Sequence, residues 1–142
     1  MPRAYSPTTA LIVVDVQNDF ADPSGSLYVT GGERVIADIN AEIAAAHAAG
    51  AQVIYTQDWH PPVSPHFATS GGIWPEHCIA GSWGAALHPA LDQLDGDDMT
   101  YVHKGLGPVD GYSAFTGRDL ESGTNTATYL AATLRARGIT AV

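Results

Sequence analysis

The chain has 142 residues, of which 45% are hydrophobic and 15% charged, and its 15 acidic and 6 basic side chains give a formal net charge of −9. This length is typical of one globular domain, which buries roughly 68–70% of its unfolded surface and needs no disulfide to stay folded. The single cysteine, Cys78, excludes an internal disulfide framework, and the absence of clustered Lys and Arg argues against a nucleic-acid partner.

Nothing in the sequence predicts a membrane partner or export. No apolar stretch approaches the length that crosses a bilayer, and residues 1–7 do not resemble a secretory signal peptide. We therefore expect a cytoplasmic protein with one domain over residues 1–142, and we leave homo-oligomerisation open.

The first half of the chain has the pattern of a strand, a helix and a second strand. Residues 10–14 form a short β-branched apolar run, as in a parallel strand buried on both faces. Apolar positions then recur at helical spacing from Glu33, and Gly50 is placed to end that helix. Residues 52–56 predict the second strand. Such a unit crosses over right-handed and gathers ligands at the carboxyl ends of its strands, where Asp15 and Asp58 follow.

The second half is less regular. Prolines exclude regular structure between Pro61 and Pro89, and a loop this long is usually functional. Residues 99–103 predict a third strand that ends at Lys104, followed by a loop over residues 105–123. A helix should follow, with Thr124 as its N-cap and Gly138 at its end. Its apolar face would consist of Ala127, Leu130, Ala131 and Leu134. Residues 139–142 should begin a fourth strand.

A carboxylate and three imidazoles share the proline-rich segment in the order Asp-x-His-x5-His-x10-His. These are Asp58, His60, His66 and His77. Such a set suits zinc, iron, manganese or nickel, and a loop can fold separated side chains onto one ion. A single histidine in a loop is more often a solvated or hydrogen-bonding group, but the cluster after a strand end favours a metal site.

Two charged residues at strand ends are candidates for catalysis. Asp15 is a candidate general base, and Lys104 could pair with it in a cleft. The alternative for Asp15 is a residue that caps the following turn. Phe20, Trp74 and Tyr112 are candidate pocket walls, although aromatic residues more often only pack. Cys78 follows a candidate metal ligand, and we interpret it as structural.

Taken in order, several segments closely resemble the nicotinamidases of the isochorismatase-like cysteine hydrolase superfamily. They are Asp15-Val16-Gln17-Asn18-Asp19-Phe20, Asp58-Trp59-His60, His66-Phe67, Trp74-Pro75-Glu76-His77-Cys78, His103-Lys104-Gly105 and Tyr112-Ser113-Ala114-Phe115. The resemblance runs from about Leu11 to the last residue. Its order and spacing are more specific than any single motif.

The resemblance implies a three-layer α/β/α fold with a parallel sheet and an enzyme that deamidates nicotinamide to nicotinate and ammonia through a cysteinyl thioester, a reaction of NAD salvage. It implies that Asp15 is the general base, that Lys104 supports it, and that one divalent zinc, iron or manganese ion binds the pyridine nitrogen. Its implied ligands are Asp58, His60, His66 and His77, and the implied pocket residues are Phe20, Leu27, Trp74 and Tyr112.

One feature of that family is missing from the sequence. The family's nucleophilic cysteine stands at the start of the helix after the fourth strand, where the helix dipole and backbone N–H groups favour its thiolate. Val142 lies inside that strand, so the expectation is a chain that supplies the first two thirds of the domain. A related amidase for another small amide and a non-catalytic metal- or ligand-binding protein remain as alternatives.

Overall fold

A computed structural model describes residues 4–96, 100–107, 109–110, 112–119, 122 and 124–142. The chain forms a three-stranded parallel sheet in the order β1-β2-β3 and a small antiparallel sheet in the order β4-β5-β6. The elements are β1 Ala10–Val14, α1 Asn18–Ala21, η1 Gly32–Val35, α2 Ile36–Ala48, β2 Gln52–Asp58, η2 Ala68–Ser70, β3 Tyr101–Lys104, β4 Val109–Asp110, β5 Thr116–Asp119, β6 Asn125–Ala127 and α3 Leu130–Ala136.

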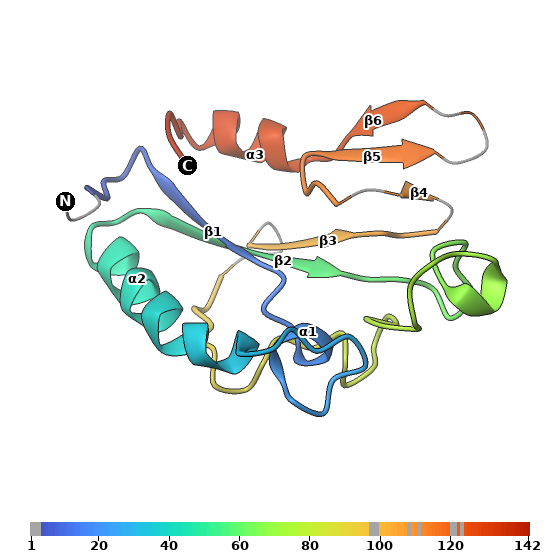
Figure 1. The fold of residues 1–142 in the computed structure, drawn as a ribbon. Helices are drawn as coiled ribbons and strands as arrows, with labels where there is room; N and C mark the ends of the chain where they lie inside the picture. The colour runs from blue at the N-terminus through green and yellow to red at the C-terminus, as the bar shows by residue number, and fades with distance from the viewer. Residues whose placement is uncertain (1–3, 97–99, 108, 111, 120–121, 123) are drawn as a thin grey trace.

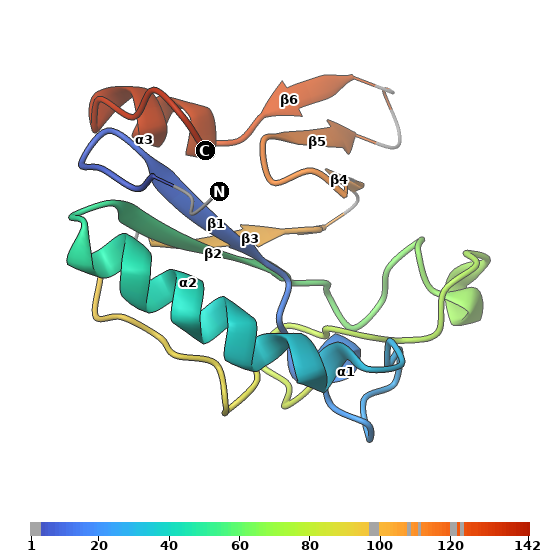
Figure 2. The ribbon, with the colours of Figure 1, turned by 60° about the vertical axis from the view of Figure 1, so that its left-hand side comes forward.

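The parallel sheet lies between two helices, which makes three layers. Figures 1 and 2 show α2 on one side of the sheet and α3 on the other. Successive strand residues point to opposite faces, so Val53 and Tyr55 pack towards α2, whereas Ile54 packs towards Leu130 and Leu134 of α3. The expected α/β class with a parallel sheet is confirmed.

The strand and helix predictions for the first half are confirmed with small changes. Strand β1 has the predicted bounds, and β2 continues two residues further, to Asp58. A 3-10 turn leads into α2, which therefore begins at Ile36 rather than Glu33. Gly50 has a φ of +72° and donates its N–H to the carbonyl of His47, as expected for a residue in the left-handed conformation that ends an α-helix.

The proline-rich segment is irregular as predicted, apart from the short turn η2 and isolated bridges. The third strand is confirmed over Tyr101–Lys104; the predicted start at Met99 lies outside the described residues. In the predicted fourth strand, one bridge joins Ala141 to Thr9 in parallel, on the edge of β1 opposite β2.

The predictions between residues 105 and 130 were wrong in two places. The expected loop contains β4 and β5, and the helix expected from Thr124 begins only at Leu130. Residues 125–127 instead form β6 and pair antiparallel with β5. Pairing with a neighbouring strand overrides helical periodicity here, because β-branched threonines favour extended structure. Gly123, the predicted end of the loop, lies outside the described residues.

The helices in the described part of the chain are all too short or too polar to span a bilayer.

Loss of packing in the centre of the sheet should cost more stability than the same loss on the surface. Ile54 is fully buried, whereas Val63 is 77% exposed. Ile54→Ala should lower the free energy of unfolding by about 2–5 kcal/mol, and Val63→Ala by less than about 0.5 kcal/mol. Urea unfolding followed by circular dichroism measures both values. Equal losses for the two variants would contradict the assigned core.

Candidate active site

Three charged side chains meet at the carboxyl ends of the three parallel strands. Asp15 directly follows β1, Asp58 ends β2 and Lys104 ends β3. The Nζ atom of Lys104 lies 2.6 Å from Oδ2 of Asp15 and 3.0 Å from Oδ1 of Asp58, and all three side chains are largely buried. The parallel register sets Asp58 opposite Lys104. The structure therefore brings together the two residues that the sequence suggested for catalysis.

The lysine ammonium has a partner for each of its three protons. Besides the two carboxylates, Lys104 donates to the backbone carbonyl of Tyr112 at 3.0 Å. Burial opposes the charge on Lys104, but the two carboxylates outweigh it and raise its pKa. Burial likewise opposes ionisation of Asp58, but contacts with His60 and Lys104 outweigh it and lower the pKa of Asp58. Both groups are therefore held in their charged forms.

Asp15 has a constrained backbone as well as a paired side chain. Its φ is +53°, a backbone conformation that residues other than glycine rarely adopt. The carboxylate Oδ1 accepts a hydrogen bond from the hydroxyl of Thr56 at 2.6 Å, while Oδ2 faces Lys104. Cys78 is the other residue besides glycine with a positive φ in the described part of the chain. Strain of this kind gathers at functional sites, where the surroundings enforce it.

Asp58, His60 and His77 form a group that could hold a metal ion. One ligand atom from each lies within 4.8 Å of the others. The Nδ1 atoms of His60 and His77 lie 3.1 Å from the carbonyl of Gly105 and 2.7 Å from that of Pro75. Those contacts assign the proton to Nδ1 and leave each Nε2 facing Asp58 Oδ2, at 3.8 and 3.9 Å. Metal-binding histidines are oriented in this way, so the residues fit a divalent ion.

Two further features suit this group to metal binding. Burial lowers the pKa of His77, so its imidazole stays neutral, as a ligand must. Gly105 has a φ of +75°, and a Cβ there would lie 2.5 Å from the ring of His60. Only glycine at position 105 therefore lets the imidazole approach the carbonyl that orients it.

His66 lies next to this group but is not part of it. Its ring centroid is 5.0 Å from that of His60. The structure therefore brings together three of the four ligands that the sequence suggested.

A pocket of about 240 Å³ opens beside these charged groups. It contains all four of the residues suggested for substrate binding, and its full lining is Asp15, Phe20, Leu27, Asp58, His60, Trp74, His77, Lys104 and Tyr112. A lining that combines apolar side chains with charged groups suits a small planar molecule with one polar substituent.

Cys78 has none of the features of a nucleophile. Its side chain is fully buried and does not line the pocket. Burial raises the pKa of its thiol, and the carboxylates of Asp58, Asp19 and Asp15 raise it further. A reactive cysteine needs access and a lowered pKa, so the geometry favours the structural role suggested for Cys78.

Sequence reasoning missed three buried polar residues that hold the site. Gln17 bonds to the backbone of Asp58, Asp19 to the backbone of Cys78, and Thr56 to the carboxylate of Asp15. For Gln17 and Asp19, the run Gln17-Asn18-Asp19 shortly after the strand β1 was the available signal, because three consecutive buried polar residues must each find partners.

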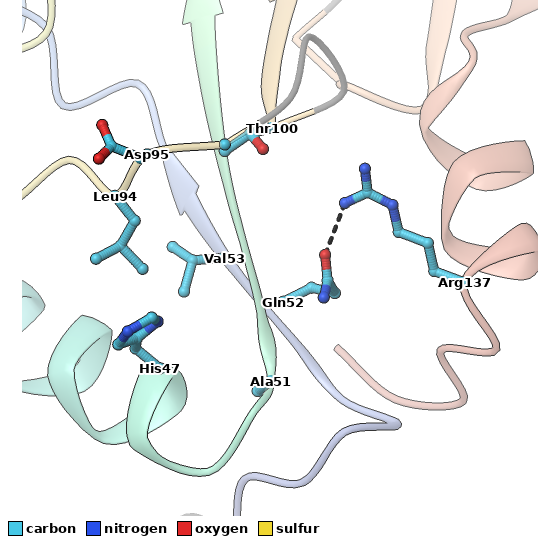
Figure 3. A pocket seen from close by; sticks show the side chains of 9 residues that line it. His47, Ala51, Gln52, Val53, Leu94, Asp95, Thr100 and Arg137 are labelled. Carbon is cyan, nitrogen blue, oxygen red and sulfur yellow. Dashed lines mark hydrogen bonds between the residues drawn. The ribbon is translucent and has the colours of Figure 1, made fainter.

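A second hollow, of about 440 Å³, lies at the opposite end of β2 and β3. Figure 3 shows it between α2 and the end of α3, with Arg137 donating to the side-chain oxygen of Gln52 at 2.7 Å. Ligands of open parallel sheets bind at the carboxyl ends of the strands. The candidate active site is therefore the smaller pocket at the carboxyl ends.

Comparisons with known proteins show the family of the chain and the proteins that it resembles. Residues 9–142 match the isochorismatase domain family. The chain is 40% identical over 136 residues to the nicotinamidase/pyrazinamidase of Mycobacterium tuberculosis, covering 92% of this chain and 66% of that protein. It is 37% identical over 162 aligned positions to a ureidoacrylate amidohydrolase of Methylobacterium radiotolerans, covering 98% of this chain and 56% of that protein.

A solved structure has the same fold. The pyrazinamidase of Pyrococcus horikoshii in complex with zinc matches with a TM-score of 0.78 and 34% identity, over 96% of this chain and 71% of that one. Against the first three curated relatives, the chain spans 57 to 66% of their lengths.

Replacement of Lys104 should destabilise the fold, because Asp15 and Asp58 would lose the cation that pairs with them. In the metal-free protein, Lys104→Met should lower the free energy of unfolding at neutral pH by about 3–5 kcal/mol. The pKa of Asp58 is lowered by folding, so the stability from this pairing is present above about pH 4 and is lost as the pH falls through the folded value. Urea titrations with chelator present, from neutral to acidic pH, should show the deficit shrinking.

The matched control for this experiment is Arg34→Met. Arg34 forms an exposed pair with Glu33 at 3.5 Å, and solvent screens such a pair, so its loss should leave the free energy of unfolding nearly unchanged. A Lys104→Met deficit as small as this, or one that persists unchanged in acid, would contradict the proposed electrostatics.

Proposed function

The chain belongs to the isochorismatase domain family, and on that premise we propose that its protein hydrolyses nicotinamide to nicotinate and ammonia. The observation that carries this proposal is one pocket that joins the Asp15–Lys104 pair, the Asp58, His60 and His77 group, and apolar walls. The likeness to a nicotinamidase/pyrazinamidase at 40% identity supports it.

In this proposal the chain's own residues bind the ring and move a proton. Phe20, Leu27, Trp74 and Tyr112 enclose the planar pyridine ring. Asp15 acts as general base through its carboxylate, and Lys104 orients that carboxylate through a contact of 2.6 Å. The hydroxyl of Thr56, bonded to the other oxygen of Asp15, fixes which oxygen faces the substrate.

Asp58, His60 and His77 would hold one divalent metal ion, with His66 as a proposed fourth ligand. When bound, the ion would supply a Lewis-acid contact for the pyridine nitrogen. Zinc, iron and manganese all suit a site of one carboxylate and imidazoles, and the zinc complex of the pyrazinamidase from Pyrococcus horikoshii supports the first of these.

We propose that the nucleophile is a cysteine other than Cys78, because the Cys78 thiol is buried and its pKa is raised. Asp15 takes the proton of that thiol, and the sulfur attacks the amide carbonyl. The C–N bond then breaks, ammonia leaves with the proton, and a thioester remains. Water attacks the thioester, which releases the acid and restores the thiol. Cys78 is the single cysteine of these 142 residues, so the proposed nucleophile lies outside them.

A second candidate is hydrolysis of another small amide. The likeness to a ureidoacrylate amidohydrolase, at 37% identity, favours it. The two candidates share the Asp15–Lys104 chemistry and differ in whether the substrate has a ring nitrogen for the metal.

Compartment and biological role belong to the same proposal. We propose the cytoplasm, because the one cysteine of this sequence is buried and fits a reducing compartment. Nicotinate formed there would feed pyridine nucleotide biosynthesis.

Replacement of the proposed base should abolish turnover. In the protein expressed from its complete reading frame, Asp15→Asn should lower kcat for ammonia release from nicotinamide by about 10²–10⁴-fold. The control Asp38→Asn, on the exposed side of α2, should retain wild-type kcat. Turnover that survives Asp15→Asn, or wild-type protein that releases no ammonia from nicotinamide, would contradict the proposal.

Metal removal should discriminate between the two candidates. Chelation should raise KM for nicotinamide, because the pyridine nitrogen loses its partner, but not for benzamide, which has the same shape and no ring nitrogen. Steady-state assays before and after chelation, followed by zinc restoration, measure both constants. Equal effects on the two substrates would favour the amidase for another small amide.

A further inference from the structure

We propose that Gln17 and Asp19 are positioning residues that hold the two ends of the metal-binding segment, residues 58–78, in the geometry that accepts an ion. This inference rests on the proposed function only in taking Asp58, His60 and His77 as metal ligands. Gln17 and Asp19 would thus affect metal affinity without being metal ligands themselves.

Gln17 holds the first end of the segment. Its side chain is fully buried, and its Oε1 accepts the N–H of Asp58 at 2.8 Å while its Nε2 donates to the carbonyl of the same residue at 2.8 Å. The second Nε2 proton bonds to Ala85 at 2.8 Å. The side-chain amide of Gln17 thus forms hydrogen bonds with both the N–H and the carbonyl of Asp58, as a neighbouring strand would. The backbone that carries this ligand therefore cannot rotate without breaking two hydrogen bonds to a fully buried side chain.

Asp19 holds the other end. Its buried carboxylate accepts the N–H of Cys78 at 2.7 Å and that of Ser26 at 3.1 Å. The N–H of Cys78 belongs to the peptide that joins it to His77, so this bond orients the backbone of the third ligand. It also supports the positive φ of Cys78, +47°. At position 84, glycine makes room, because any Cβ there would collide with the carboxylate of Asp19.

Both anchors belong to one rigid unit. Gln17 and Asp19 lie two residues apart, at the start of α1, and Asn18 between them donates its side-chain N–H to the carbonyl of Trp83 at 2.8 Å. The N–H of Asp19 bonds to the carbonyl of Gly84 at 3.0 Å. Asp58 and His77, which lie 19 residues apart in the sequence, are therefore both fixed to the same short segment of backbone. A site formed in advance in this way spares the ion the cost of ordering a loop.

Gln57 provides a matched control for Gln17. It is also a buried glutamine, and its Nε2 donates to the same carbonyl of Ala85, at 2.9 Å. Its side chain points to the opposite face of β2 from that of Asp58. Replacement of either glutamine by methionine removes a buried amide of similar size, but only Gln17→Met releases the backbone of Asp58.

The test measures zinc affinity of the purified, metal-stripped chain by competition with a chromogenic chelator. Gln17→Met and Asp19→Asn should each weaken binding of Zn²⁺ by about 10–100-fold, the usual effect of losing a group that orients a ligand. Gln57→Met removes one side-chain hydrogen bond where Gln17→Met removes three, so it should lower the thermal midpoint of the metal-free protein by less than Gln17→Met, and it should leave the Kd for Zn²⁺ within about threefold of wild type.

Equal Kd values for Gln17→Met and Gln57→Met would overturn the inference. If Gln17→Met does not unfold cooperatively, Asp19→Asn decides, and a wild-type Kd for that variant overturns the inference. A chain that binds zinc in this graded way without any amide hydrolysis in the complete protein would contradict the proposed function alone. A wild-type chain that binds no zinc would remove the metal site and this inference with it.

Discussion

The ammonium of Lys104, held between the carboxylates of Asp15 and Asp58, is the interaction on which the candidate site depends. Two carboxylates that both lie within 3.0 Å of one ammonium and are largely shielded from solvent would repel each other without a cation between them. The parallel register supplies that cation, because it sets the end of β3 opposite the end of β2. The close approach of these charged groups thus depends on strand pairing as much as on residue type.

Asp58 links the two halves of the site. Its Oδ1 faces Lys104, which also contacts the proposed general base Asp15, while its Oδ2 faces the imidazoles of His60 and His77. One carboxylate therefore belongs both to the proposed proton-transfer pair and to the candidate metal group. A change in its backbone position would disturb both, so the buried amide of Gln17 matters to the site although Gln17 does not line the pocket.

Much of the fold follows from local patterns. The continuous apolar run of β1 predicts a strand, and the apolar positions of α2 recur at helical spacing and predict a helix. The expected burial of β1 on both faces is only partly met, since Val14 is 60% exposed at the edge of the sheet. The prediction for residues 105 to 130 was wrong for a physical reason. Strand β6 is stabilised by β5, eight or so residues away, and Thr128 bonds to the backbone of Phe115. Such pairing is not visible in the helical spacing of Ala127 and Leu130.

For the site, residue types and their order were enough to single out Asp15, Lys104, Asp58, His60 and His77, because base, cation and ligand chemistry can be recognised in the side chains themselves. The tertiary structure decided which of them meet. It grouped two of the three loop histidines with Asp58, left His66 beside them, and buried Cys78 away from the pocket. It also revealed Gln17 and Asp19, whose partners lie 41 and 59 residues away. A hydrogen bond over that separation depends on strand register and loop path, which no local pattern encodes.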